Sequence, residues 1–391
     1  MEVPAEHRMD AAASGLVADP LPIAQALIRC RSVTPADDGA LAVIERILGP
    51  LGFRCTRLRF NDTENLFARR GEGGPHLCLA GHTDVVPPGA RRADGGYEGW
   101  QHDPFAATVE NGTLFGRGAT DMKGGLAAMI AAAHRPQARG SLSFLVTGDE
   151  EGDAHDGTVR VLDWMAANGH TPDMCLVGEP TSKSVLGDTV KIGRRGSLTA
   201  YLTVHGTQGH VAYPQRADNP VHRLVRVLHR LTAAPLDSGT EWFEASSLQV
   251  TTFDVGNPAT NVVPAEARAT LNIRFNNLHT AASLEATIRA ALDAEAPRHE
   301  ARFSCSGESF LTQLGPFVEA IRRAVATTTG QQPQLDTGGG TSDARFITHH
   351  CPVAEFGAVG TTMHKVDECT PVAELRALAG TYDAVIRECL G

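Results

Sequence analysis

The sequence predicts an α/β protein: a larger domain with a mostly parallel, twisted sheet flanked by helices, and a smaller ferredoxin-like domain inserted into it. First, apolar runs of strand length alternate with amphipathic helical segments early and late in the chain, as in a parallel sheet covered on both faces. Second, between residues 194 and 308 the order changes to βαββαβ, the ferredoxin-like order. Third, 391 residues are enough for about two domains. The larger domain would comprise residues 1–193 and 309–391.

Hydrophobic periodicity places the elements of the larger domain. Helices are expected where apolar residues recur every three to four positions, and strands where short apolar runs end at turn-forming residues. The expected helices span residues 21–30, 41–49, 124–135, 158–169, 316–330 and 372–389. The expected strands span residues 53–60, 76–82, 141–148, 173–180 and 352–358, with a short hairpin at 107–118.

The inserted domain has its own rhythm of strands and helices. The segment 197–206 alternates like a half-buried strand. It is followed by a helix, two strands, a second helix and a last strand, expected at residues 219–233, 247–256, 265–277, 281–296 and 300–307. This order predicts one four-stranded sheet with two helices.

Composition narrows the possible partners and compartments. The formal net charge is −10, which disfavours a nucleic-acid partner or an anionic membrane surface. The N-terminal segment has no basic stretch feeding an apolar run, and no segment reaches membrane-spanning length, so a cytoplasmic protein is expected. The eight cysteines lack CxxC spacing, which favours reduced thiols over disulfides or a zinc finger.

Acids and histidines follow the predicted strands, at the sheet edge where open α/β sheets bind ligands. They are His82, Asp84, Asp121, Glu150, Glu151, Glu179 and His364. Each has an ordinary explanation: an Asp can stabilise a turn or cap a helix, and a loop Glu can simply be solvated. Recurrence at five successive positions favours a cation site, in which adjacent carboxylates divide metal binding and proton transfer between them.

Five motifs carry a family resemblance. In order, GHTDVVP, GRGATDMKGG, TGDEEG, GEPT and MHKVDE resemble those of the dinuclear zinc amidohydrolases, a family that includes carboxypeptidase G and acetylornithine deacetylase. With the inserted domain, the resemblance covers nearly the whole chain. It implies that the larger domain is catalytic and binds two Zn²⁺, which Co²⁺ or Mn²⁺ can replace, and that the inserted domain forms a homodimer.

The resemblance assigns roles to the residues of these motifs. It implies five metal ligands: His82, Asp121, Glu151, Glu179 and His364. Asp121 would bridge the two ions, and a cis peptide bond would follow it. Asp84 would orient His82 through a carboxylate–imidazole hydrogen bond, and Glu150 would be the general base. Two imidazoles and three carboxylates independently suit zinc, because two cations offset the mutual repulsion of the acids.

Residues outside the cluster are expected to contact the substrate. His210 lies in a Gly-flanked turn, and the resemblance implies that it stabilises the oxyanion across a dimer interface; a surface histidine is the alternative from sequence alone. Cationic, amide and hydroxyl groups would recognise substrate carboxylates. They are Lys191, Arg194, Asn261, Arg274, Gly340 and Thr341. Ordinary surface charge is the alternative for the run from Lys191 to Arg195.

Segments around these residues resemble one branch of the family, which cleaves N-succinyl-LL-2,6-diaminopimelate to succinate and LL-2,6-diaminopimelate. One position departs: the branch often has Asn four residues before its last histidine ligand, where this chain has Gly360. An acetylornithine deacetylase or another N-acyl-amino-acid amidohydrolase would share every metal ligand. A two-domain amino-acid-binding protein with one structural cation is the alternative from another class, but it would have no use for Glu150 beside Glu151.

Overall fold

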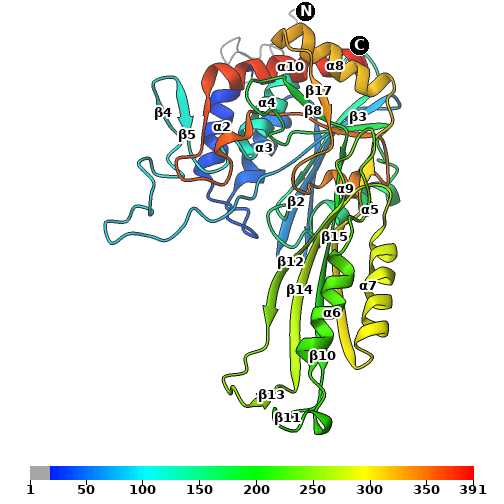
Figure 1. Ribbon diagram of the computed structural model, residues 1–391. Coiled ribbons are helices and arrows are strands. Elements are labelled where there is room, and N and C mark those ends of the chain that lie inside the picture. Colours follow the sequence, from blue (N-terminus) through cyan, green and yellow to red (C-terminus); the bar gives the residue numbers. More distant parts are fainter. Residues whose placement is uncertain (1–17) are drawn as a thin grey trace, which may run out of the picture. The chain divides into compact units, whose positions relative to one another are not determined.

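The computed structural model describes residues 18–391, which form two compact units (Figure 1). The first unit runs to Ile192 and continues over Thr312–Asp336 and Ser342–Gly391. The second consists of Gly193–Leu311 and the short segment Thr337–Thr341. The chain enters and leaves the second unit on paired strands, β9 (Gly193–Arg194) and β16 (Phe310–Leu311), which are antiparallel.

An eight-stranded mixed sheet is the centre of the first unit. Its strands, in spatial order, are β1 (Arg54–Phe60), β2 (Thr63–Gly71), β6 (Ser141–Thr147), β3 (His76–His82), β7 (Met174–Val177), β18 (Val353–Glu355), β8 (Thr189–Lys191) and β17 (Gln334–Asp336). The four central strands, β6, β3, β7 and β18, are parallel to one another. β3 and β6 are buried at every position, as expected for strands covered on both faces.

Helices flank this sheet on both sides (Figure 1). They are α2 (Pro20–Arg29), α3 (Ala40–Leu48), α4 (Lys123–Ala132), α5 (Thr158–Ala167), α8 (Pro316–Thr329), α9 (Ala344–Ile347) and α10 (Val372–Leu390). α4 and α10 pack on β3, whereas α5 packs on β2 and β6. Every residue of α4 is buried, because its side chains are small or apolar except for Lys123, whose Nζ donates to the Cys30 carbonyl at 2.7 Å.

Three strands of this sheet were not predicted, namely β2, β8 and β17. β2 carries Glu64, Asn65, Arg69 and Arg70, so its apolar pattern is weak, and a tight turn at Asn61 pairs it with β1. β8 and β17 have only three residues each. Every antiparallel pairing in the sheet involves β2 or β8, whereas β8 pairs in parallel with the edge strand β17.

The second unit contains an antiparallel sheet in the order β12-β14-β10-β15. The strands are β10 (Gly196–His205), β12 (Ser247–Asp254), β14 (Glu266–Phe275) and β15 (His299–Gly307), and the helices are α6 (Pro220–Thr232) and α7 (Ala281–Glu295). Alternate residues of β14 are buried in one core with both helices. Asn219 caps α6, and Thr280 and Ser283 form a capping box at α7, so local sequence sets both helix starts.

Short ribbons complete the described part of the chain. β4 (Thr108–Glu110) and β5 (Thr113–Phe115) form the expected hairpin, to which β19 (Cys369–Pro371) adds a third strand. In the second unit, β11 (Gly209–His210) pairs with β13 (Val262–Val263). Within residues 18–391, none of the helices combines the length and the apolar character needed to cross a membrane.

Candidate metal centre

The register of the central strands brings distant polar residues to one edge of the sheet. His82, the last residue of β3, pairs with Thr147, the last residue of β6. Ala80 of β3 pairs with Val177, the last residue of β7. The segments that follow β6 and β7 therefore start beside His82, and they carry Glu150, Glu151 and Glu179.

His82 is buried, and both of its ring nitrogens face acceptors. Nδ1 donates to the backbone carbonyl of Asp84 at 2.8 Å. Because a carbonyl can only accept, Nδ1 carries the proton, and Nε2 is the nitrogen available for a ligand bond. Nε2 lies 3.3 Å from Oδ1 of Asp121 and 3.7 Å from Oε1 of Glu179.

Asp121 lies between two groups of possible metal ligands. Its Oδ1 faces His82, and its Oδ2 lies 3.3 Å from Nε2 of His364. One group is His82, Asp121 and Glu179, and the other is Asp121, Glu151 and His364. Within each group, one ligand atom from every residue lies within 4.8 Å of the others. A carboxylate shared by two such groups would be able to offer one oxygen to each of two cations.

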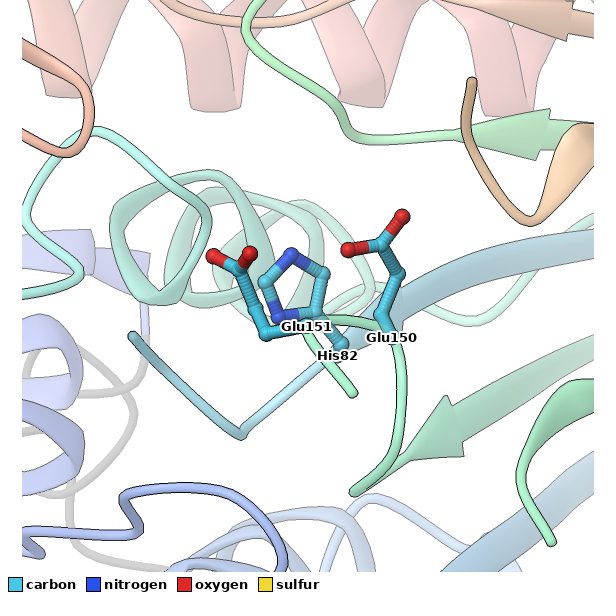
Figure 2. A group of neighbouring side chains, drawn as sticks. All are labelled: His82, Glu150 and Glu151. Atoms are coloured by element: carbon cyan, nitrogen blue, oxygen red, sulfur yellow. The ribbon is translucent and has the colours of Figure 1, made fainter. Parts of the chain in front are cut away.

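Glu150 and Glu151 sit on opposite sides of the His82 imidazole (Figure 2). The Glu151 carboxylate accepts a hydrogen bond from Nε2 of His364 at 2.9 Å. Glu150 instead lines a small pocket together with Glu179 and Asp343. The two adjacent acids therefore have different partners, although one atom of each also lies within 4.8 Å of His82 in a third group of possible ligands.

The cluster holds more buried negative charge than its own groups neutralise. Burial raises the pKa of Glu179 well above its ordinary value, and Asp121 adds to this rise. Oε1 of Glu179 is buried with no hydrogen-bond partner in the described part of the chain. The pKa of His364 is raised to about 10, by hydrogen bonds to Asp121 and then Glu151. A positive charge is therefore favourable here, and bound divalent cations would supply it.

This donor set fits a pair of zinc ions. Imidazole nitrogens and carboxylate oxygens are ordinary zinc ligands, and each group of three leaves further coordination positions for water or substrate. A buried glutamate oxygen without a hydrogen-bond donor is the kind of atom that a cation satisfies.

Asp84 contacts the site differently from the sequence prediction. The expected carboxylate–imidazole hydrogen bond does not form, since Oδ1 of Asp84 is 3.6 Å from Nδ1 of His82 and the Asp84 carbonyl takes that proton. The buried carboxylate instead accepts the backbone N–H groups of Glu150, at 3.3 Å, and Glu151, at 3.1 Å. Thr34 donates its hydroxyl to the same carboxylate at 2.8 Å. Asp84 thus holds the turn that presents both glutamates.

Two acids near the site were missed by the sequence analysis. Glu368 is fully buried and accepts the N–H of Asp121 at 2.9 Å. Asp343 lines the pocket beside Glu150 and accepts the hydroxyl of Thr158 at 2.6 Å. Glu368 lies inside the MHKVDE motif, and Asp343 lies two residues after Thr341. The sequence shows both acids, but it does not show which donors they contact.

The family's cis peptide bond is present between Asp121 and Met122. Gly360 begins the short 3₁₀ helix η2 (Gly360–Thr362). A Cβ there would lie 3.1 Å from the carbonyl oxygen of Pro180 and would collide with the end of the Met363 side chain. A side chain at position 360 would thus require Met363 to move, which is consistent with Gly where the branch often has Asn.

Among the residues expected to bind substrate, Lys191 is in the first unit. It is buried in β8, and its Nζ donates to Asp336 at 2.8 Å. Asp336 also pairs with Lys183, at 3.0 Å. Lys191 thus belongs to an ion-pair network within the first unit.

The other expected substrate-binding residues, and His210, are in the second unit. His210 is exposed in β11, and its Nδ1 accepts the N–H of Ala212 at 3.1 Å. Arg194 is buried and donates to the Gly340 carbonyl at 3.0 Å, so that carbonyl, rather than an amide, is engaged. Asn261 is exposed just before β13, Arg274 is partly exposed in β14, and Thr341 ends the segment that joins this unit.

Comparison with known proteins defines the class of protein. The model of peptidase family M20/M25/M40 matches residues 78–388. The chain therefore belongs to this family, whose members are metal-dependent hydrolases.

Close relatives share one name. The succinyl-diaminopimelate desuccinylase of Acidiphilium cryptum is 59% identical over 371 residues, covering 94% of this chain and 98% of the relative. The protein of the same name from Gluconacetobacter diazotrophicus is 57% identical over 380 residues, covering 95% and 97%.

Solved structures of the family share the fold at low identity. The aminopeptidase PepT of Bacillus cereus has a TM-score of 0.75 at 19% identity, covering 95% of this chain and 98% of its own. The YXEP protein of Bacillus subtilis, described as a dinuclear metal binding peptidase, has a TM-score of 0.69 at 16% identity, covering 97% and 98%. These likenesses establish the mixed α/β fold of the M20 family for this chain.

Proposed function

We propose that this protein hydrolyses the amide bond of N-succinyl-LL-2,6-diaminopimelate, releasing succinate and LL-2,6-diaminopimelate, a step toward lysine and diaminopimelate. Relatives more than half identical over nearly the whole chain carry the name of this activity. The carrying observation in the structure is the pair of ligand groups that share Asp121, with Glu150 beside them. A binding protein with a single structural cation has no need of the second group.

The first group would hold one Zn²⁺ through His82, Asp121 and Glu179, and the second group would hold another through Asp121, Glu151 and His364. Co²⁺ or Mn²⁺ would substitute, because both accept nitrogen and oxygen ligands. When bound, the two ions would polarise the scissile carbonyl and lower the pKa of water toward about 7. The buried negative charge of the carboxylates, which two cations would neutralise, supports this assignment.

Glu150 would be the proton-transfer group. It would take a proton from the attacking water and return it to the leaving amino group, so that water adds across the broken C–N bond. Asp84 supports this role, because its carboxylate holds the backbone of Glu150 and Glu151 in one turn. Without cations, burial raises the pKa of Glu150 to about 8, and neighbouring cations would lower it again.

Substrate recognition would use cationic, amide and hydroxyl groups. The substrate carries several carboxylates, which suits Arg194 and Arg274 as donors together with Lys191. Asn261, Gly340 and Thr341 would add amide and hydroxyl contacts. His210 would stabilise the oxyanion that forms at the scissile carbonyl.

The protein would work as a cytoplasmic homodimer through the second unit. β12 lies at the edge of the four-stranded sheet and is largely exposed, with Val250 and Phe253 about two-fifths exposed. An exposed edge strand can pair with a second copy, which supports this assembly. The net charge of −10 supports a small-molecule substrate rather than a nucleic acid or an anionic membrane.

Parallel kinetics on two substrates test the proposal. N-succinyl-LL-2,6-diaminopimelate should have a kcat/KM at least about tenfold above that of N-acetylornithine, which corresponds to roughly 1.4 kcal/mol of transition-state discrimination. Faster turnover of N-acetylornithine would instead assign the protein to the deacetylases of the same family.

A further inference from the structure

Glu368 binds the loop that carries Asp121. Its Oε1 accepts the N–H groups of Thr120 and Asp121, both at 2.9 Å. Its Oε2 accepts the N–H of Gly118 at 3.1 Å and Nη1 of Arg117 at 2.7 Å. The carboxylate is fully buried, and these four donors satisfy it.

These donors need a carboxylate. The N–H groups of Thr120 and Asp121 lie just before Met122, the N-cap of α4, so they have no partners within the helix. A buried negative charge there satisfies them and also interacts favourably with the helix dipole. A neutral amide of the same size would turn its own NH₂ group toward at least one of these donors.

The same contacts join this loop to the segment that carries His364. Arg117 also donates to the carbonyl of Lys365 at 3.1 Å, and Gly116 donates its N–H to the Glu368 carbonyl at 2.9 Å. Thr120 donates its hydroxyl to the Cys369 carbonyl at 2.9 Å. Hydrogen bonds therefore connect the loop 116–121 directly to the segment 364–369. Together these segments carry Asp121 and His364, two ligands of the group that also includes Glu151.

The other group also contains Asp121, but its two remaining ligands do not depend on these contacts. His82 is the last residue of β3, and Glu179 follows β7 by two residues, so the ladder between these parallel strands holds both. His364 has no such support, since it lies in a loop with a left-handed backbone, at φ 60°, and its side chain is half exposed.

We propose that Glu368 is a positioning residue, which holds Asp121 and His364 at the spacing that the cation bound by Asp121, Glu151 and His364 requires. Glu368 itself lies outside the ligand groups. The inference rests on the proposed function, because it deepens the two-cation site assigned there.

The test is a Co²⁺ titration of the full-length chain after removal of metal with a chelator. Calorimetry gives the stepwise affinities, and the visible absorption of Co²⁺ reports the geometry of each bound ion. For the wild-type chain we expect two equivalents, with the His82 group filling first because two of its three ligands, His82 and Glu179, are held by the sheet. Glu368→Gln should weaken the second step by about 10- to 100-fold, the usual effect of losing an outer-shell partner, and change the first by less than about threefold.

Controls separate this role from general stabilisation. Asp173→Asn removes a carboxylate that accepts the N–H of His76 at 2.8 Å, at the opposite end of β3, and both binding steps should stay as in the wild type. If Glu368→Gln does not fold, Arg117→Lys decides the question. This substitution keeps the positive charge beside Glu368 but loses the hydrogen bond to the Lys365 carbonyl. It should selectively weaken binding of the second Co²⁺.

Each result points one way. Equal weakening of both steps, or unchanged affinities in a folded variant, would overturn the positioning role. A wild-type chain that binds no Co²⁺, or only one equivalent, would instead contradict the proposed two-cation site itself. The two failures are therefore distinguishable.

Discussion

At the residue scale, the site depends on a difference between two adjacent acids. Glu151 accepts a hydrogen bond from His364, whereas Glu150 faces a pocket lined by Glu179 and Asp343. Burial raises the pKa of Glu150 to about 8, and the charges of Asp343 and Glu151 add to this rise. A buried carboxylate whose pKa is raised toward neutrality suits the general acid–base role proposed for Glu150.

Glu150→Ala should therefore remove catalysis but not metal binding. We expect kcat to fall by about 10²- to 10⁴-fold, the usual contribution of a general base, with two metal equivalents retained in elemental analysis. Asp153→Ala changes an exposed acid on the same turn and should stay within about twofold of the wild type. Loss of one metal equivalent from Glu150→Ala would make Glu150 a ligand instead.

The residue types of this cluster were predictable, but several of their contacts were not. The candidate residues lie next to helices and strands with clear hydrophobic periodicity, and the structure brings them together. They are His82, Asp121, Glu150, Glu151, Glu179 and His364. The partner of the Asp84 carboxylate was predicted wrongly, because a carboxylate can accept from any nearby donor and the sequence does not show which is in reach. Glu368 was missed for the same reason.

At the element scale, α4 helps to position Asp121, which precedes it, because the helix packs closely against the strand ends. A Cβ at Gly125 would lie 2.7 Å from the carbonyl oxygen of Gly178, the residue before Glu179. Only glycine permits this approach between helix and strand. The small residues of α4 thus place Asp121 near His82.

Gly125→Ala and Gly380→Ala should have opposite effects on stability. The first forces backbone atoms apart and should cost about 1–3 kcal/mol, as overpacking does, while weakening Co²⁺ binding. At Gly380, in α10, a Cβ would meet nothing within 4 Å, so alanine should stabilise the helix by about 0.5–1 kcal/mol. Urea unfolding of both variants measures this, and equal destabilisation would refute the packing argument.

β3 also contains a pH-sensitive residue at its start. Burial lowers the pKa of His76 to about 4, and the nearby charge of Arg69 adds to the effect. The unfolded chain, with a pKa near 6.5, binds more protons between these values, so stability rises with pH there. The contribution of neutral His76 to the free energy of unfolding is fully present above about pH 6.5. It falls by about 3 kcal/mol as the pH drops through 4.

His76→Gln should remove this part of the acid sensitivity. Urea unfolding of the metal-free chain between pH 4 and 7 should show a shallower dependence in the variant than in the wild type. His155→Gln changes an exposed histidine and should keep the wild-type slope. Parallel pH profiles for wild type and His76→Gln would show that His76 is not protonated on unfolding.

At the scale of the whole molecule, the chain divides into two units, and the candidate metal ligands all belong to the first. The second unit has its own core of two helices on a four-stranded sheet. Metal binding should thus stabilise the first unit directly, while the inserted unit keeps its own packing.

Metal removal should consequently have a local effect. At a free metal concentration 100-fold above Kd, binding stabilises the native state by about 2.7 kcal/mol, and chelation removes this. Hydrogen exchange should become faster in the segments 118–125, 147–152, 178–182 and 360–368, while β10 and β14 keep their protection. An equal loss of protection in both units would contradict this division.

The sequence by itself determined the α/β class, the ferredoxin-like order of the insertion, and the positions of the acids and histidines at strand ends. These features depend on periodicity and short motifs, which are local properties of the chain. The tertiary structure decided which atoms meet: the Asp84 carboxylate binds two backbone amides, and Glu368 reaches Asp121 across 247 residues of sequence. These hydrogen bonds depend on how segments that are distant in sequence pack against one another in the folded sheet. The local sequence pattern of each segment does not specify that packing.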